Sequence, residues 1–145
     1  MRFRLLGPLE ITEAGQPVPL RPLMQRLLLA HLLLLTGRPA SNSELAHRLW
    51  DGTPPRGARN TLQVHVMRLR RWLDAAVVDP DRRPRIETGP DGYQLILGDS
   101  DLDAVRFRRL IAEAAELETR HHHREQLAVL DRAIGMWRGP VLDGL

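Results

Sequence analysis

The stretch RGARNTLQVHVMRLRRWL, Arg56–Leu73, carries the apolar spacing of an amphipathic helix and constrains how its neighbours can be arranged. At about 100° per residue, its apolar side chains fall on one face at 4-3-4 spacing: Leu62, Val66, Leu69 and Leu73. We expect this face to be the buried anchor of a helix that runs from about Arg56 to Asp74.

The opposite face of this helix is basic and partly apolar. From Arg56 to Arg71 there are five arginines and no acidic residue, whereas a merely solvated helix usually mixes charges for intrahelical pairing. Val64 and Met67 also lie outward, and thymine methyl groups in the major groove of DNA are natural partners for them. The pattern therefore indicates a helix that reads DNA. A basic surface helix without a ligand is the alternative.

Two groups of DNA contacts are predicted. Arg68 suits a guanine edge and Gln63 an adenine edge, so the predicted base-reading group is Gln63, Val64, Met67 and Arg68. Phosphate contacts fix register rather than sequence, and the residues that suit them on this helix are Asn60, Thr61, His65 and Arg71. In the later polar loop, phosphate contacts could also come from Arg82, Arg83 and Arg85, although such arginines can equally be solubilising.

The flanking segments predict the order of a winged helix-turn-helix. Short strands at about 2–6, 9–12 and 18–20 suggest a small antiparallel sheet. One helix is expected from Pro22 to Leu35, and a Ser41–Glu44 capping box starts a second that passes through Trp50. Residues 86–88 and 93–97 indicate a hairpin, the wing. Strands, three helices and a hairpin therefore make up the predicted domain 1–98.

Residues 99–145 predict a second, purely helical unit. One helix, capped by Asp101 or Asp103, reaches about Thr119, and another spans about Arg124 to Trp137 after a polar turn at 120–123. The expected apolar stripes are Phe107, Leu110, Ala114 and Leu117, then Leu127, Leu130, Ile134 and Trp137. A single hairpin of this kind cannot bury its apolar face alone. We favour a chain cut short over a short natural version whose hairpin packs on the first domain.

Composition and charge narrow the class of protein. There is no cysteine, which excludes disulfides, thiolate metal sites and thiol nucleophiles. Residues 1–98 hold 14 arginines against 9 acidic residues, while residues 99–145 hold 7 against 9. This asymmetry suggests a nucleic-acid-binding domain followed by a different unit.

Enzymes, metal proteins and membrane proteins are all disfavoured. The apolar run Leu27–Leu35 is far shorter than the roughly 20 residues of a membrane span and lacks a signal-peptide pattern, so we expect a cytoplasmic protein. His121–His123 fits a polar turn better than a metal site. No phosphate-binding loop, dinucleotide motif or nucleophile–base spacing occurs, so we expect no enzyme activity, cofactor or metal.

Several motifs occur in order along the chain: RFRLLGPLE at 2–10, LW at 49–50 with PP at 54–55, ARNTLQVHV at 58–66, RLRR at 68–71 and DGYQL at 91–95. Together they resemble the Streptomyces antibiotic regulatory proteins. DAVRF at 103–107 and LDRAIGMWRGP at 130–140 resemble the bacterial transcriptional activator domain that follows in that family. The resemblance covers essentially the whole chain.

The resemblance implies a definite fold. It is an α+β protein: an OmpR-type winged helix-turn-helix with an N-terminal antiparallel sheet in 1–98, then the start of an all-α, tetratricopeptide-like domain in 99–145. In one respect this chain departs from the family. OmpR-type wings commonly place an arginine before the Gly-Tyr turn for the minor groove, and here these positions are Glu87, Thr88 and Gly89.

The resemblance also implies a transcription activator. Members bind direct repeats near the −35 promoter element, fitting two protomers on double-stranded DNA, and often control secondary-metabolite (antibiotic) genes. They contact RNA polymerase, including the principal sigma factor, through a loop that is here Asp51, Gly52, Thr53, Pro54 and Pro55. The alternative is a repressor or a protein-interaction module that binds a partner through the helical hairpin and outward Val64, Met67 and Trp72.

Overall fold

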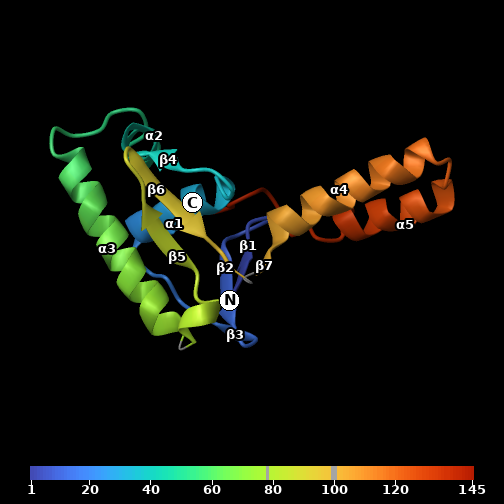
Figure 1. The fold of residues 1–145 in the computed structure, drawn as a ribbon, viewed down its shortest axis with the longest axis horizontal. Coiled ribbons are helices and arrows are strands. Elements are labelled where there is room, and N and C mark those ends of the chain that lie inside the picture. Colours follow the sequence, from blue (N-terminus) through green and yellow to red (C-terminus); the bar gives the residue numbers. More distant parts are fainter. Residues whose placement is uncertain (78, 99–100) are drawn as a thin grey trace.

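The computed structural model describes residues 1–77, 79–98 and 101–145 (Figure 1). Its N-terminal sheet has the strand order β3-β2-β1-β7. Its three antiparallel strands are β1 (Arg2–Arg4), β2 (Glu10–Glu13) and β3 (Gln16–Pro17), and each pairs with the next in the chain. The sequence predicted an antiparallel sheet of this kind. The third strand nevertheless lies before the predicted 18–20, because the turn at Ala14 and Gly15 is tight enough for pairing to begin at Gln16.

Three helices and a wing complete the first domain. The helices are α1 (Leu23–Leu34), α2 (Asn42–Leu49) and α3 (Ala58–Ala76). The wing is formed by β5 (Arg85–Thr88) and β6 (Gly92–Ile96), with a short 3-10 helix, Pro80–Arg82, in the loop before it. The predicted winged helix-turn-helix order is therefore confirmed. No helix in the described part of the chain is long and apolar enough to cross a membrane.

A two-residue strand that the sequence did not reveal ties the wing to α2. β4 (Ala40–Ser41) pairs with β6, so the second sheet has the order β4-β6-β5. Gly92 makes this approach possible, because a β-carbon there would lie 1.9 Å from the Ala40 carbonyl oxygen. Ser41 then caps α2 by accepting from the Glu44 N–H at 3.0 Å. The predicted capping box is only half formed, since the Glu44 carboxylate pairs with Arg38.

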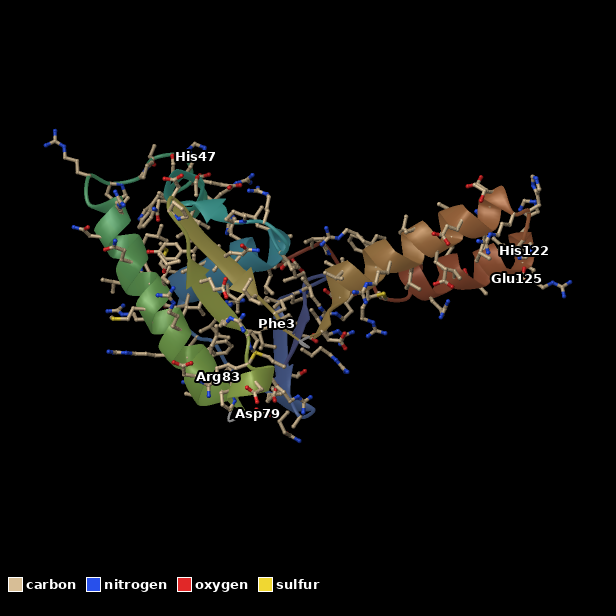
Figure 2. All side chains as sticks on the ribbon, in the orientation of Figure 1. Phe3, His47, Asp79, Arg83, His122 and Glu125 are labelled. Carbon is tan, nitrogen blue, oxygen red and sulfur yellow. The ribbon has the colours of Figure 1, made fainter. Side chains whose placement is uncertain are left out.

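The helices α4 (Asp103–Thr119) and α5 (His123–Ile134) form the predicted hairpin, which projects away from α3 (Figure 1). The turn before His123 is confirmed, and Figure 2 shows His122 at the far end. The predicted stripe on the second helix is wrong. Leu127 and Ile134 are 63% and 68% exposed, and α5 ends before Trp137. Val129 and Ala133 face α4 instead, because these smaller side chains allow the helices to approach closely.

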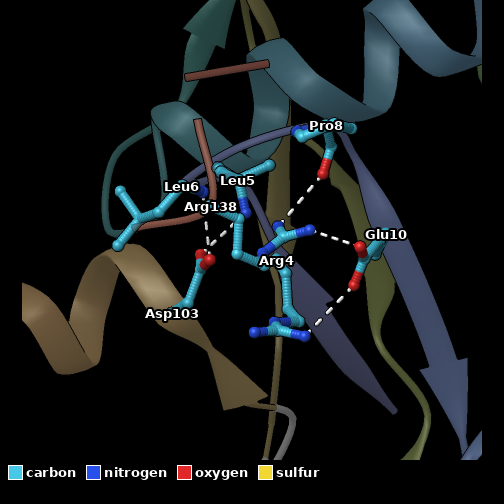
Figure 3. Close-up of polar contacts among 7 residues, drawn as sticks. All are labelled: Arg4, Leu5, Leu6, Pro8, Glu10, Asp103 and Arg138. Atoms are coloured by element: carbon cyan, nitrogen blue, oxygen red, sulfur yellow. Dashed lines mark hydrogen bonds and ion pairs between the residues drawn. The ribbon is translucent and has the colours of Figure 1, made fainter. Parts of the chain in front are cut away.

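Asp103 joins the start of the hairpin to the N-terminal sheet (Figure 3). Its carboxylate accepts hydrogen bonds from the backbone N–H groups of Leu5, at 2.8 Å, and Leu6, at 3.0 Å. Asp103 therefore does not cap α4 as predicted, and the N-cap position is Leu102. Leu102 belongs to β7 (Asp101–Leu102), which pairs in parallel with β1. The predicted boundary between 98 and 99 falls beside residues 99–100, which lie outside the described residues.

The segment after α5 returns to the same place. The backbone N–H of Arg138 donates to the Leu6 carbonyl at 2.8 Å, and that of Leu142 donates to the Leu5 carbonyl at 3.0 Å. The Arg138 guanidinium donates to the Pro8 carbonyl and pairs with Glu10 (Figure 3). Both ends of the hairpin are thus bonded to residues 5–10. We call these contacts the junction.

Asp103→Asn should lower the free energy of unfolding by about 1–3 kcal/mol, because an amide can accept only through one of its two ends and leaves a buried N–H without its partner. Urea denaturation measures this change. Asp101→Asn is the matched control, since Asp101 makes an exposed ion pair with Arg2 at 3.4 Å and should cost less than about 1 kcal/mol. Equal effects of the two changes would show that the buried bonds do not stabilise the fold.

Candidate nucleic-acid interface

α3 divides into a buried face and an exposed face, as its sequence predicts. Leu62, Val66, Leu69 and Leu73 are at most 1% exposed and pack in the common core. This core also takes in α1, α2, the wing and the N-terminal sheet. The helix is therefore held along most of its length, so its outer face is a rigid surface for binding a ligand.

The predicted base-reading group lies together on the exposed face. Gln63 and Arg68 are exposed, and Val64 and Met67 are 40% and 44% exposed. Within the described residues, the guanidinium of Arg68 has neither a hydrogen bond nor an ion pair. These four side chains present one cation, one amide and two apolar groups to solvent. That combination can meet a guanine edge, an adenine edge and thymine methyl groups.

The residues predicted to contact phosphates have less uniform surroundings. Asn60, Thr61 and Arg71 are exposed, although the Thr61 hydroxyl already donates to the Gly57 carbonyl at 3.2 Å. His65 is half-buried, and its Nδ1 lies 2.9 Å from the side-chain nitrogen of Gln25 on α1. Burial of the ring, helped by the positive charge of Arg68, lowers the pKa of His65. The lowered pKa favours the neutral ring, which can still meet a phosphate as a hydrogen-bond donor.

Gln25 is a residue of the site that sequence reasoning missed. It is buried, and its amide donates to His65 Nδ1, which places the ring proton on Nε2. The signal was available, because Gln25 is a polar residue on the buried face of α1, in line with Leu28, Leu29 and Leu32. A buried amide at such a position requires a partner.

Arg70 connects α3 to the wing. Its guanidinium donates to the Ile86 carbonyl, at 2.7 Å and 3.0 Å, and to the Thr88 hydroxyl at 2.8 Å. It also lies 5.9 Å from the centre of the Tyr93 ring, which is buried at the base of the wing. The helix that carries the candidate base contacts and the hairpin beside it are therefore locked together.

The arginines before the wing have different surroundings. Arg83 donates to the Val77 carbonyl and pairs with Asp74 at 2.8 Å, so it fixes the loop after α3 (Figure 2). Arg85 is exposed on β5 and pairs with Glu87 at 2.9 Å. Arg82 lies in the short 3-10 helix and is exposed. Arg85 can contact a phosphate only by exchanging its ion pair with Glu87, which costs little at the surface.

The loop Asp51–Pro55 is exposed throughout and lies before the N-terminal end of α3 (Figure 1). Asp51 and Gly52 both have positive φ angles, 47° and 81°, and the Gly52 N–H donates to the His47 carbonyl at 2.7 Å. This turn ends α2 at the Trp50 cap, and two prolines stiffen the rest. The result is a fixed projection beside the candidate DNA-reading face.

Comparisons with known proteins find two family matches along the chain. Residues 15–95 match the family described as "Transcriptional regulatory protein, C terminal", and residues 102–145 match the "Bacterial transcriptional activator domain". The chain belongs to the Streptomyces antibiotic regulatory protein family. The two matched domains follow each other in the order that its motifs indicate.

Relatives in this family are named as regulators. The chain is 35% identical to the transcriptional regulatory protein MoaR1 of Mycobacterium tuberculosis, over 100% of this chain and 46% of the relative. It is 30% identical to the transcriptional regulator RedD of Streptomyces coelicolor, over 98% and 40%. The structure of Mycobacterium tuberculosis EmbR with a low-affinity phosphopeptide matches with a TM-score of 0.83 and 35% identity, over 98% and 37%. The chain spans less than half the length of these relatives.

Changes at the neighbours Arg70 and Arg71 should affect different properties. Arg70→Gln should lower the free energy of unfolding by about 1–3 kcal/mol, because it removes charge-assisted bonds to the wing. Arg71→Gln should leave stability unchanged and weaken duplex binding, with a salt dependence reduced by about one phosphate contact. Denaturation and fluorescence anisotropy measure the two effects. If Arg71→Gln changes stability and not binding, Arg71 does not contact a phosphate.

Proposed function

We propose that this chain activates transcription by binding direct repeats in promoter DNA and recruiting RNA polymerase. The observation that carries the proposal is the outer face of α3, where Val64, Met67 and Arg68 stand exposed on a helix without acidic residues until Asp74. Gln63 completes the base-reading group, and Asn60, Thr61, His65, Arg71 and Arg85 supply phosphate contacts. Two protomers bind tandem repeats in the same helical phase.

The Asp51–Pro55 loop provides the polymerase contact. When α3 lies in the major groove, this loop stands next to the duplex and remains accessible, because all five residues are exposed. Its backbone is held by the turn at Asp51 and Gly52, so a partner meets a preformed surface. The partner is the polymerase, including its principal sigma factor, and the regulated genes are those of secondary metabolism. Family membership supports this proposal.

A second candidate function is protein binding through the hairpin, either as a repressor or as an interaction module. The exposed Leu127 and Ile134 on α5 favour it. Trp72 does not belong to such a surface, because it is half-buried and its indole nitrogen donates to the Pro19 carbonyl at 3.0 Å. The two functions differ in what α3 contributes, and the salt dependence of duplex binding separates them.

The first test is anisotropy with a promoter fragment that carries two direct repeats, at increasing salt. Binding through phosphate contacts should weaken by about 10³-fold or more between 50 and 200 mM salt if roughly six phosphates are neutralised. A fragment with one repeat disrupted is the control and should bind more weakly. Undetectable binding to any promoter fragment at low salt would reject α3 as a DNA-reading helix and favour the second function.

Val64→Ala together with Arg68→Ala should remove sequence preference at a cost of about 1–3 kcal/mol for each good base contact. Both side chains are exposed, so the fold should be unaffected. The measurement is the ratio of affinities for the preferred site and a scrambled site. Arg59→Ala, an exposed change on the same helix outside the base-reading group, is the control and should keep the ratio. An unchanged ratio in the double variant would exclude this face as the reader.

Alanine changes at Asp51, Thr53 and Pro54 should reduce activated transcription several-fold and leave DNA affinity intact, because the loop contacts polymerase rather than the duplex. In vitro transcription with purified polymerase and anisotropy on the same promoter give the two readouts. Gly52 is kept, since its positive φ angle is needed for the turn. Equal losses of affinity and transcription would contradict a polymerase contact.

A further inference from the structure

An open pocket lies between β2 and the segment that leads into α1, apart from the exposed face of α3. Its volume is about 530 Å³, within the range of small-molecule sites. The walls are predominantly apolar and are formed by Leu9, Ile11, Pro17, Val18, Pro19 and Leu20. The pocket is therefore large enough for a molecule of drug size and suits one with an apolar body.

The charged residues that line this pocket differ in whether they already have a partner. Arg21 and Arg26 stand at its α1 end, and among the described residues neither guanidinium has a hydrogen bond or an ion pair. The one acidic residue in the lining, Glu10, is already engaged by Arg4 and Arg138. The cavity thus combines an apolar wall with two available cations, and a guanidinium is a preferred partner of a carboxylate.

We propose that this pocket binds an apolar carboxylic acid, with the hydrocarbon part against Leu9, Val18 and Leu20 and the carboxylate on Arg21 and Arg26. A neutral apolar molecule would leave both arginines without a partner. A purely ionic ligand would not use the apolar walls. Neither property is needed for DNA binding through α3, so this site is additional to the proposed function and does not rest on it.

A hydrogen bond connects the pocket wall to α3. The carbonyl of Pro19, in the wall, accepts from the indole nitrogen of Trp72 at 3.0 Å, and Trp72 lies one turn after Arg68. Glu10, which also lines the pocket, belongs to the junction that holds the hairpin. A molecule in the pocket therefore touches the supports of both the reading helix and the hairpin, and the Trp72 indole reports its presence.

The test is a titration of the ¹⁵N-labelled chain with octanoate, followed by the indole N–H signals of its three tryptophans. Trp72→Phe assigns the signal of Trp72. Octanoate should shift that signal, because Trp72 is bonded to the pocket wall, and octan-1-ol should bind about tenfold more weakly because it lacks the charge-assisted bonds. Equal affinities of acid and alcohol, or no shift of the Trp72 signal, would overturn the proposal.

Two variants locate the site. Val18→Trp should fill the pocket and abolish the octanoate shift, while Arg21→Gln with Arg26→Gln should reduce octanoate affinity to that of octan-1-ol. Thermal unfolding confirms that both variants fold, and a variant that unfolds is replaced by Leu20→Gln, which makes the wall polar. Octanoate affinity unchanged in the charge variant overturns the proposal. The proposal is also overturned if the charge variant loses duplex affinity alone, because that result would assign the arginines to DNA. A third contrary result is a dimer of the chain that Val18→Trp dissociates while octanoate does not bind at all.

Discussion

The backbone of Leu5 and Leu6 is the point on which the arrangement of the molecule depends. After β1 these residues leave the ladder, and their N–H and carbonyl groups are buried and must find partners elsewhere. The Asp103 carboxylate accepts from both N–H groups. The carbonyls of Leu6 and Leu5 accept from the backbone N–H groups of Arg138 and Leu142. Gly7 adjoins this contact, since a β-carbon there would lie 2.9 Å from that of Arg138. One short segment therefore sets the direction of the hairpin relative to the winged-helix domain.

Local patterns predicted the elements well, because each is decided by spacing within one segment. The 4-3-4 anchor of α3, the Gly-Tyr wing and the polar turn before His123 depend on neighbours in the chain. The strands β4 and β7 were missed since each has two residues and exists only through a distant partner, Tyr93 for Ala40 and Phe3 for Leu102. The stripe on α5 failed for a related reason. Periodicity finds apolar faces, but the smaller Val129 and Ala133 decide which face α4 covers.

In the candidate site, too, local sequence predicted some features and distant contacts decided the others. Exposure of Val64, Met67 and Arg68 follows from the helical wheel, and the sequence was sufficient to place them. The environments of His65 and Arg70 were not predictable, because Gln25 and the Ile86 carbonyl are 40 and 16 residues away. The contact with Ile86 gives Arg70 a different role from its neighbour Arg71. Arg70 supports the wing, whereas Arg71 faces solvent, although both are arginines in one RLRR motif.

Closure of the junction also orders events during synthesis. The carbonyl of Leu5 accepts from the N–H of Leu142, which is synthesised much later, so this bond cannot form until Leu142 has left the ribosome. The core of α1, α2 and α3 is assembled from residues 28–73, which emerge much earlier. A nascent winged helix can therefore collapse while its first strand is still incompletely bonded. Closing so long a loop is entropically costly, and prior collapse of the domain shortens the effective distance that the two ends must bridge.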